Sequence, residues 1–466
     1  MESSFDAFVY GNNLSSLSPS VTSLPAYTRR PSPPPRTRRE LTEHAVELPA
    51  NTSSVRAKKP WATLRVYSKA PAGTLPTFVE GEKINGSVTL DSSSSNSRHI
   101  SSVKIRGELA TGSHEVERYS FLDCAPVTLW SSKSASQTRE SGQHWQFSID
   151  LPRHVITSSG AVNDIHAYSL PPTFMERKIR ASIRYTLIVH IQRSTFREDS
   201  DLQTAFIYVP AIRPDPPSPL RLLAYQENSP LLGPRADPKG WYSLPSAKVY
   251  GKLFNNRIVE VTCRLSLARP LSYTRGSVIP LSLVLTSKDY QALDLLSSPR
   301  VLTVILRRKV INNENNLGES KPLWKGHIQT EISREPAQDI ATAVWWQRPD
   351  DEMNIVQNTA TPRTRELEGE ILLSKSLKPT FHISHFGIEY SVAMLPFATT
   401  SFVPSTTAQR FHNGPILEQR VEIATMFPKG PRPIAHSPPE YREQAPNSAR
   451  SSLPPSRASL PPSRGR

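Results

Sequence analysis

The feature that most constrains the fold of this chain is a long series of short segments in which apolar and polar residues alternate. The clearest segment, IRYTLIVHI, carries apolar side chains at every second position: Ile183, Tyr185, Leu187, Val189 and Ile191. Successive side chains of a β-strand point to opposite faces, so this spacing, with its β-branched and aromatic residues, predicts a strand that buries one face. Comparable segments lie at residues 64–70, 83–90, 102–110, 145–151, 205–210, 258–267, 278–285, 301–306, 385–395 and 420–427. We therefore predict an all-β protein built of antiparallel β-sandwiches.

Proline-rich stretches divide these segments into blocks. The chain has 44 prolines among 466 residues, about twice the usual frequency, and a proline cannot donate a hydrogen bond to a β-ladder. The low apolar content of the two ends predicts disorder there. We predict five parts: a disordered Pro/Ser/Arg-rich arm at 1–58, a first sandwich domain at 59–211, a Pro-rich connector at 212–247, a second sandwich domain at 248–428 and a disordered tail at 429–466.

The chain is basic, with 56 Lys and Arg against 41 Asp and Glu and a formal net charge of +15. The charge is spread along the sequence, with no long block of like charges and no zinc-finger, helix-turn-helix or aromatic RNA-binding pattern. These observations argue against a specific nucleic-acid site. They leave open a loose attraction to anionic membranes or to acidic protein segments.

Three observations bear on where the chain works. The start, MESSFDAFVYGNN, lacks the basic and apolar regions of a signal peptide, and no apolar run approaches the ~18 residues needed to cross a bilayer. Two cysteines are too few for a secreted disulfide scaffold or a four-cysteine zinc site. We expect a cytoplasmic protein, in which Cys124 and Cys263 are small core residues.

No motif for catalysis or cofactor binding is found in the sequence. The twelve histidines form no metal-binding spacing such as HExxH, and GxSxG, P-loop and GxGxxG patterns do not occur. We therefore predict no catalytic residues, no metal and no cofactor, and a protein that is not an enzyme. Carboxylates dispersed over a β-sandwich are the catalytic arrangement that this search leaves open.

Several longer motifs follow one another along the two blocks of strands. They are FVEGEKINGSVTL at 78–90, SSVKIRGEL at 101–109, FSIDLP at 147–152 and LPPTF at 170–174 before RYTLIVHIQR at 184–193, RPLSYTRGSVIPLSLVL at 269–285 and FGIEYSVAMLP at 386–396. Each motif alone is common among β-sandwiches, but their order and spacing resemble the arrestin superfamily. Within it the chain resembles the α-arrestins, called arrestin-related trafficking adaptors in fungi, over about residues 61–427.

The resemblance implies two arrestin-type, immunoglobulin-like sandwiches. The chain departs from the family pattern at Thr173, where the family often has serine, and at 153–169, a long stretch that leaves room for an inserted loop before LPPTF. Residues 338–346, QDIATAVWW, fit either a short helix or a further strand. The buried charged cluster of visual arrestins is not located by these motifs, so no residue is assigned to it.

The most informative short motif lies in the tail, where Pro438, Pro439 and Tyr441 form a Pro-Pro-x-Tyr sequence. Two prolines favour a polyproline II conformation with little entropy left to lose on binding, and aromatic grooves of WW domains accept such segments. With three residues per turn, the tyrosine returns to the face of the first proline and fills a second pocket, while Glu440 points elsewhere. We predict that this motif binds a WW domain.

The two ends hold weaker candidates. Leu24, Pro25 and Tyr27 form an LPxY variant that lacks one stacking proline, so we expect weaker WW binding there. A PxxPxR pattern at residues 31–36 is better explained by the local proline content. Added negative charge beside Pro/Arg segments would alter docking, which makes tail serines candidate phosphorylation sites: Ser32, Ser437, Ser452 and Ser459.

The resemblance also implies a function. A tail PPxY motif recruits a WW-domain HECT-type ubiquitin ligase, and the sandwiches bind cytosolic tails of membrane transporters or receptors, so that cargo is ubiquitinated, internalised and sorted. Such an adaptor works in the cytoplasm, peripherally at plasma membrane and endosomes. Two alternatives stay open: a ligase-independent scaffold or signalling arrestin, as in ambient-pH signalling, and a basic protein that binds anionic lipid or nucleic acid.

Overall fold

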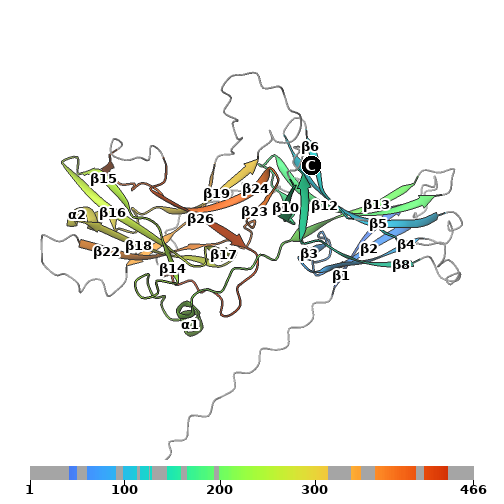
Figure 1. Cartoon of the computed structure of the whole chain (residues 1–466), viewed down its shortest axis with the longest axis horizontal. Helices are drawn as coiled ribbons and strands as arrows, with labels where there is room; N and C mark the ends of the chain where they lie inside the picture. Colours follow the sequence, from blue (N-terminus) through green and yellow to red (C-terminus); the bar gives the residue numbers. More distant parts are fainter. Residues whose placement is uncertain are drawn as a thin grey trace, which may run out of the picture. The chain divides into compact units, whose positions relative to one another are not determined.

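The computed structural model describes residues 41–49, 60–90, 98–112, 116–124, 126–128, 144–158, 165–193, 199–312, 337–347, 363–405 and 414–438. Within these ranges the chain forms strands β1 to β26 and two short helices, α1 (Pro219–Glu227) and α2 (Tyr290–Leu296) (Figure 1). Nearly all neighbouring strands are antiparallel. The prediction of an all-β antiparallel sandwich protein is confirmed.

The amino-terminal half forms one pair of sheets. One sheet has the order β1 (Thr42–Pro49), β2 (Pro60–Ser68), β4 (Lys83–Leu90), β8 (His144–Asp150). The other has the order β3 (Thr77–Val79), β13 (Ser200–Val209), β12 (Ala181–Arg193), β5 (Arg98–Thr111), β6 (Glu117–Asp123), with β11 (Phe174–Met175) on β12 and β7 (Val127–Thr128) on β5. We call this pair of sheets the first sandwich.

The carboxy-terminal half forms a second pair. One sheet has the order β21 (Val344–Gln347), β22 (Arg363–Leu372), β18 (Val278–Ser287), β16 (Arg257–Ala268), β15 (Ala247–Leu253), β25 (Phe402–Pro404), with β14 (Trp241–Ser243) on β16. The other has the order β17 (Ser272–Thr274), β26 (Leu417–Ala424), β24 (Phe386–Met394), β19 (Val304–Asn312), β20 (Gln338–Thr342), with β23 (Phe381–Ile383) on β24. We call this pair the second sandwich.

The two sandwiches repeat one plan. The order β1-β2-β4-β8 corresponds to β15-β16-β18-β22, and β3-β13-β12-β5-β6 corresponds to β17-β26-β24-β19-β20. In each sandwich a short strand pairs in parallel with the last strand, β3 with β13 and β17 with β26. A glycine in the left-handed region then turns the chain into the next strand, Gly81 at φ +83° and Gly276 at φ +80°, a conformation that glycine adopts without steric cost.

A five-residue motif, Leu-x-Pro-Thr-Phe, marks the same place in both halves, at residues 170–174 and 377–381. In the first, Tyr185 Oη donates to the carbonyl of Pro171 at 2.6 Å; in the second, Tyr390 Oη donates to the carbonyl of Lys378 at 2.8 Å. The threonines repeat as well, because Thr173 Oγ1 accepts from the Tyr208 amide at 2.8 Å and Thr380 Oγ1 from the Ile423 amide at 2.8 Å. The two motifs therefore fix equivalent corners of the two sandwiches.

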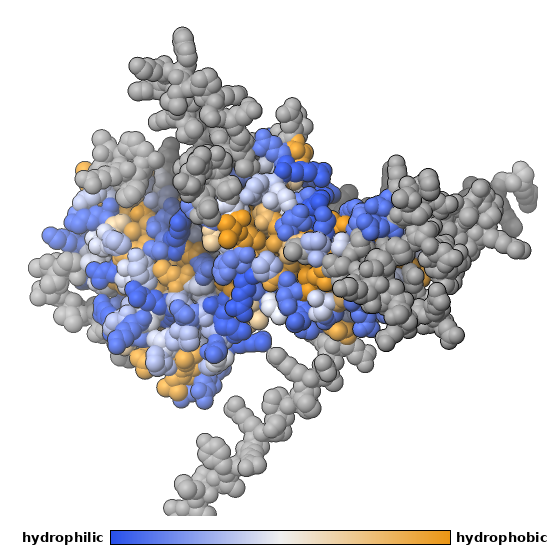
Figure 2. Space-filling model, turned by 45° about the vertical axis from the view of Figure 1, so that its right-hand side comes forward, coloured by the Kyte–Doolittle hydropathy of each residue, from blue (hydrophilic) through white to orange (hydrophobic). Residues whose placement is uncertain are grey.

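The inward faces of the alternating segments form the core. Leu64, Val88, Ile105 and Leu187 are fully buried, as are their counterparts in the second half such as Leu283. Burial of apolar surface at roughly 25 cal/mol per Å² is the main stabilising contribution of such faces. On the face drawn in Figure 2, apolar residues also reach the surface as patches among hydrophilic ones.

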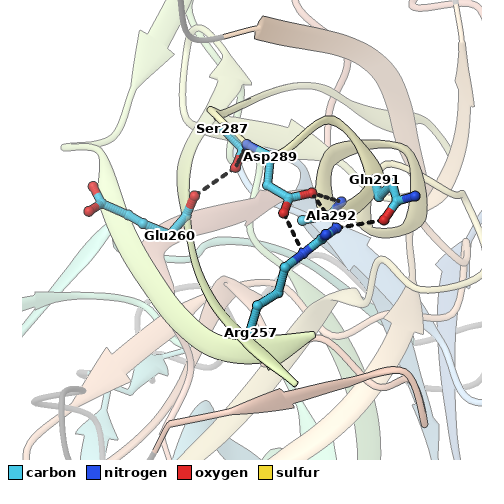
Figure 3. A network of polar contacts seen from close by, with 6 residues as sticks. All are labelled: Arg257, Glu260, Ser287, Asp289, Gln291 and Ala292. Atoms are coloured by element: carbon cyan, nitrogen blue, oxygen red, sulfur yellow. Dashed lines mark hydrogen bonds and ion pairs between the residues drawn. The ribbon is translucent and has the colours of Figure 1, made fainter. Parts of the chain in front are cut away.

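Helix α2 begins at a polar network that Figure 3 shows. Asp289 caps the helix, accepting from the Ala292 amide at 2.9 Å, and the Arg257 guanidinium lies between Asp289 and Gln291, 3.1 Å and 2.6 Å from their oxygens. The Ser287 hydroxyl donates to the Glu260 carbonyl at 2.8 Å. These contacts satisfy the helix start and join β16 to the end of β18.

The start of the first sandwich differs from the prediction. Residues 42–49, placed in the disordered arm, form edge strand β1, whose inner side chains are half-buried. The alternation is weak there because Val46 and Leu48 are its only large apolar inner residues. The strand is stabilised by its pairing with β2, which includes the contact of His44 with Ser68 Oγ at 2.9 Å. Within the stretch 153–169, strands β9 (His154–Ser158) and β10 (Ile165–Ser169) pair with each other. Of the two alternatives for residues 338–346, the strand is correct, as β20 and β21.

The predicted connector, 212–247, is largely built structure. It holds α1 and β14, because Ser218 caps α1 and Pro219 occupies the first helical position, where a missing N–H costs nothing. The proline that signals a linker in the sequence is here a helix start. The predicted disordered tail begins too early, because residues 429–438 have a defined place in the structure. Ser437, near the end of this segment, is buried.

Candidate functional site

The candidate site lies on strand β22, which carries glutamates at every second position. Their side chains therefore leave the same face of the sheet. Glu366 pairs with Arg235 at 2.7 Å, and Glu368 accepts from Trp346 Nε1 at 3.2 Å. Glu370, the third, is 6% exposed and contacts the tail.

Glu370 holds the backbone of the tail with both carboxylate oxygens. Its Oε2 accepts from the His436 amide at 2.9 Å and its Oε1 from the Ser437 amide at 3.1 Å. Hydrogen bonds to an ionised acceptor are about twice as strong as neutral ones. We call Glu370, His436 and Ser437 the tail clamp.

Neighbouring residues of the second sandwich bring Glu370 to this position. In the ladder of β22 it faces Pro280 of β18 and Val344 of β21. Beside it, Gly369 lets the ring of Trp345 pack directly on the strand, since an added Cβ would lie 2.5 Å from Trp345 Cε3. The packing of Trp345 on Gly369 therefore fixes the position of β22 at the residue next to Glu370.

A cavity of about 530 Å³ opens beside the clamp. Its walls combine aromatic and proline side chains with carboxylates, and they include Trp241, Trp346, Pro280, Glu368 and His436. Aromatic and proline surfaces with a few polar groups are typical of peptide and small-molecule sites. The cavity and the clamp share Glu370 and His436, so they form one region of the surface.

The connector builds one wall of this region. Arg221 of α1 is buried, with its guanidinium 4.8 Å from the centre of the Trp241 ring and Nη1 donating to the Arg269 carbonyl at 2.8 Å. Burial lowers the pKa of the Arg221 guanidinium below its usual value. Trp241 Nε1 in turn donates to the Leu232 carbonyl at 2.8 Å. These contacts fix the Trp241 ring against the cavity.

The structure places two of the residues predicted for the tail. Ser437 is 5% exposed and Pro438 is half-buried. A solvated serine was expected at 437, and its burial corrects that picture, because the clamp draws the backbone onto β22. The other predicted site residues lie outside the described part of the chain: Leu24, Pro25, Tyr27, Ser32, Pro439, Tyr441, Ser452 and Ser459.

Sequence reasoning missed Glu370, Trp241 and Trp346. A local signal exists for the first, since RELEGE at 365–370 alternates glutamate with Leu367 and Gly369 as a strand with one charged face. No local signal joins Glu370 to His436, which is distant in sequence. Trp241 lies in the proline-rich stretch that was predicted to be a linker, and Trp346 lies in the segment 338–346, whose pattern fits either a helix or a strand.

A second polar cluster joins the two sandwiches. Arg308 of β19, 8% exposed in its side chain, donates to both oxygens of Glu176 at 3.0 and 2.7 Å, and to Gln338 at 3.1 Å. Burial opposes its charge, but the hydrogen bonds and charge of Glu176 outweigh burial and raise the pKa of Arg308. The pair is therefore a bidentate, charge-assisted contact between the two sandwiches.

Aromatic rings of the two sandwiches also contact each other. Phe174 of the first Leu-x-Pro-Thr-Phe motif lies 6.1 Å from Phe381 of the second, between ring centroids, and 5.3 Å from Phe386. Tyr168 lies 5.8 Å from His382. The two repeated motifs therefore contact each other through their phenylalanine rings.

One of the two cysteines lies in the core and the other packs against it. Cys263 is fully buried, and burial raises the pKa of its thiol to about 12. Cys124 follows the end of β6 and is partly buried, packed against the core; burial and the charge of Asp123 raise the pKa of its thiol. Neither thiol is activated by its surroundings.

Across the described ranges, His, Cys, Asp and Glu side chains form no group of three or more that could hold a metal ion. In the same part of the chain, neither helix has the length and apolar character to cross a membrane. No protein-family model and no curated protein sequence matches the chain. What the protein does is therefore inferred from its own motifs and contacts.

Proposed function

We propose that this chain is an α-arrestin-like adaptor that links membrane cargo to a WW-domain HECT-type ubiquitin ligase. The observation that carries the proposal is the placement of the Pro-Pro-x-Tyr motif. Its first residue, Pro438, follows directly after a tail segment held on the second of two repeated sandwiches. A ligase bound there would be held close to whatever the sandwiches bind.

The repeated sandwich plan supports a binding role. Two sheets per half bury continuous apolar faces, and the exposed surface carries scattered charge with a formal excess of +15 over the chain. The proposed cargo is the cytosolic tail of a transporter or receptor. A positive surface favours work near an anionic membrane, which fits a cytoplasmic protein acting peripherally at plasma membrane and endosomes.

The mechanism is a rise in local concentration. The adaptor holds cargo on its sandwiches and the ligase on its tail, so transfer of ubiquitin to the cargo becomes effectively intramolecular. Millimolar effective concentrations are typical of short flexible connections. The adaptor supplies no chemical group to the transfer, and internalisation and sorting follow from the ubiquitin on the cargo.

The test compares two neighbouring substitutions in the full-length protein. Tyr441→Ala removes the ring that fills the second WW pocket, so we expect at least a tenfold loss of affinity for a purified WW domain of a HECT-type ligase, about 1.4 kcal/mol. Glu440→Ala is the matched control, because residue 440 points away from the groove, and its affinity should stay within threefold of wild type. Calorimetry measures both.

The alternatives give different results. Equal binding by Tyr441→Ala and wild type would remove the basis for ligase recruitment. A ligase-independent scaffold would keep its cargo or sorting partners when the tail after residue 438 is deleted. Binding of anionic lipid or nucleic acid would weaken steeply with salt, while WW binding through prolines and tyrosine would not.

A further inference from the structure

We propose that the tail clamp is an intramolecular docking site that competes with the WW domain, and that phosphate on Ser437 keeps the tail from docking again once it has left the clamp. This inference rests on the proposed function for its consequence, but the clamp itself stands on contacts in the described chain. Glu370, a buried carboxylate, holds the two amides that directly precede Pro438. The occupant is thus the chain's own segment, residues 436–438.

The chemistry of the clamp requires a carboxylate. Two backbone N–H groups point at the two oxygens of Glu370, and a carboxylate is an acceptor at both. A glutamine of the same shape would keep one acceptor and turn an NH₂ group, a donor, toward one of the amides. Glu370→Gln therefore opposes the clamp while it leaves the packing volume unchanged.

Docking and WW binding need the same residue. A WW groove stacks on the rings of the Pro-Pro pair, and the first ring, Pro438, is half-buried where the clamp holds the tail. To present both prolines, residues 436 and 437 must leave Glu370. The observed affinity for a WW domain is therefore reduced by the fraction of molecules in which the tail is docked.

Ser437 is the residue whose phosphorylation would keep the tail away from the clamp. It is 5% exposed, and its amide lies 3.1 Å from Glu370 Oε1. A phosphoserine carries a charge of about −1.5 to −2 at neutral pH, so it would bring that charge close to the buried carboxylate of Glu370. Like charges in such surroundings repel strongly, and the modified segment cannot return to β22.

The modification needs a protein kinase and ATP. The γ-phosphoryl group of ATP passes to Ser437 Oγ: the Oγ–P bond forms, the bond to ADP breaks, and the hydroxyl proton is released. Because Ser437 is buried in the docked tail, the kinase acts on molecules whose tail has left the clamp. Phosphate then blocks re-docking, so the modification traps the WW-binding state.

The experiment measures WW affinity by calorimetry for the full-length protein, two clamp variants and a free peptide of residues 430–446. We expect wild type to bind on the order of tenfold more weakly than the peptide, and Glu370→Gln and Ser437→Glu to approach the peptide. Two matched controls should behave as wild type. Glu366→Gln removes a carboxylate from the same face of β22, and Ser452→Glu adds the same charge beyond the clamp.

A second readout separates the clamp from the proposed function. Hydrogen exchange of the His436 and Ser437 amides should be slow in wild type and at least tenfold faster in Glu370→Gln. Slow exchange that Glu370→Gln accelerates, with a peptide that fails to bind WW domains, would keep the clamp and reject ligase recruitment. A peptide that binds the WW domain with the same measurable affinity as wild type, or amides that exchange equally fast in both proteins, would overturn the clamp. Ser437→Glu changes the tail alone, so it stays informative if Glu370→Gln does not fold.

Discussion

The two sandwiches share one strand order and one corner motif, yet they differ at two matched positions that decide what each can bind. Opposite the corner tyrosine, the first sandwich has Gly107 facing Tyr185, and the second has Arg308 facing Tyr390. The ring of Phe121 covers Gly107 so closely that an added Cβ would lie 2.7 Å from it. Arg308 reaches Glu176 instead.

The second difference lies on the other sheet. Counted from the glycine turns Gly81 and Gly276, Ser148 opposite Asn85 corresponds to Glu370 opposite Pro280. Ser148 and Asn85 are exposed and contact each other at 2.8 Å. Glu370 is buried under the tail. The same backbone position therefore carries an ordinary surface pair in one sandwich and the clamp in the other.

These differences show which positions of the repeated fold make contacts outside their own sandwich. Shared positions, such as the two corner tyrosines, are satisfied within their own sandwich. The departures place a buried charge in the second sandwich, and each charge finds its partner elsewhere: Arg308 in the first sandwich and Glu370 in the tail. A buried charge is retained where its partner satisfies it.

The largest effect should come from Arg308→Met, which breaks the comparison at the join between the sandwiches. The change leaves the partly exposed Glu176 without its cation, and the loss of two charge-assisted hydrogen bonds from the buried Arg308 costs about 3 kcal/mol. Arg307→Met is the matched control, because Arg307 pairs with the exposed Asp339 at 3.1 Å, a contact worth less than about 1 kcal/mol. Urea unfolding measures both. Equal losses in the two variants would contradict a special role for Arg308.

A smaller and symmetric effect is expected at the corners. Tyr185→Phe and Tyr390→Phe each remove a hydroxyl and leave one buried carbonyl, of Pro171 or Lys378, without that donor. We expect each to lower the free energy of unfolding by about 1–2 kcal/mol. Similar losses would show that the corners are energetically equivalent. A loss of stability in only one variant would mean that the two tyrosine hydrogen bonds, although alike in geometry, contribute differently to the free energy of unfolding.

Alkaline pH gives these variants a second readout. Burial raises the pKa of Tyr390 to about 12, whereas an unfolded tyrosine ionises near 10. Between these values the unfolded chain releases the proton and the folded chain keeps it, so stability falls as pH rises from about 10 to about 12. Phenylalanine has no such proton, and Tyr390→Phe should flatten this fall relative to wild type.

The parts of this structure that were predictable are those whose signal is local. In β4, β12, β16 and β24 the alternation of apolar and polar residues is visible within each strand. Successive side chains point to opposite faces of the sheet, so consecutive residues show which face is buried. Edge strand β1 is weakly patterned, since neighbouring β2 provides much of its stability. Helix α1 was hidden by proline, which ends most helices but suits their first residue.

The candidate site divides in the same way. The Pro-Pro-x-Tyr motif is visible in consecutive residues, and its first proline is where the described chain ends. The clamp joins a strand glutamate to amides more than sixty residues later. Backbone amides carry no residue identity, so His436 and Ser437 give no hint of their acceptor. Such a contact depends on the whole second sandwich and not on any local pattern.

The smallest expected effect tests whether the matched position itself makes a clamp. Ser148→Glu installs the glutamate of the second sandwich at the equivalent place in the first, where the side chain is exposed, so stability should change by less than about 0.5 kcal/mol. In a full-length Glu370→Gln background it should not restore slow exchange of the His436 and Ser437 amides, because these amides lie at β22 of the second sandwich, whereas Ser148 lies on β8 of the first. Restored protection would show that the tail docks wherever a glutamate occupies this ladder position, and the burial of Glu370 beside the tryptophan-lined cavity would then lose its importance.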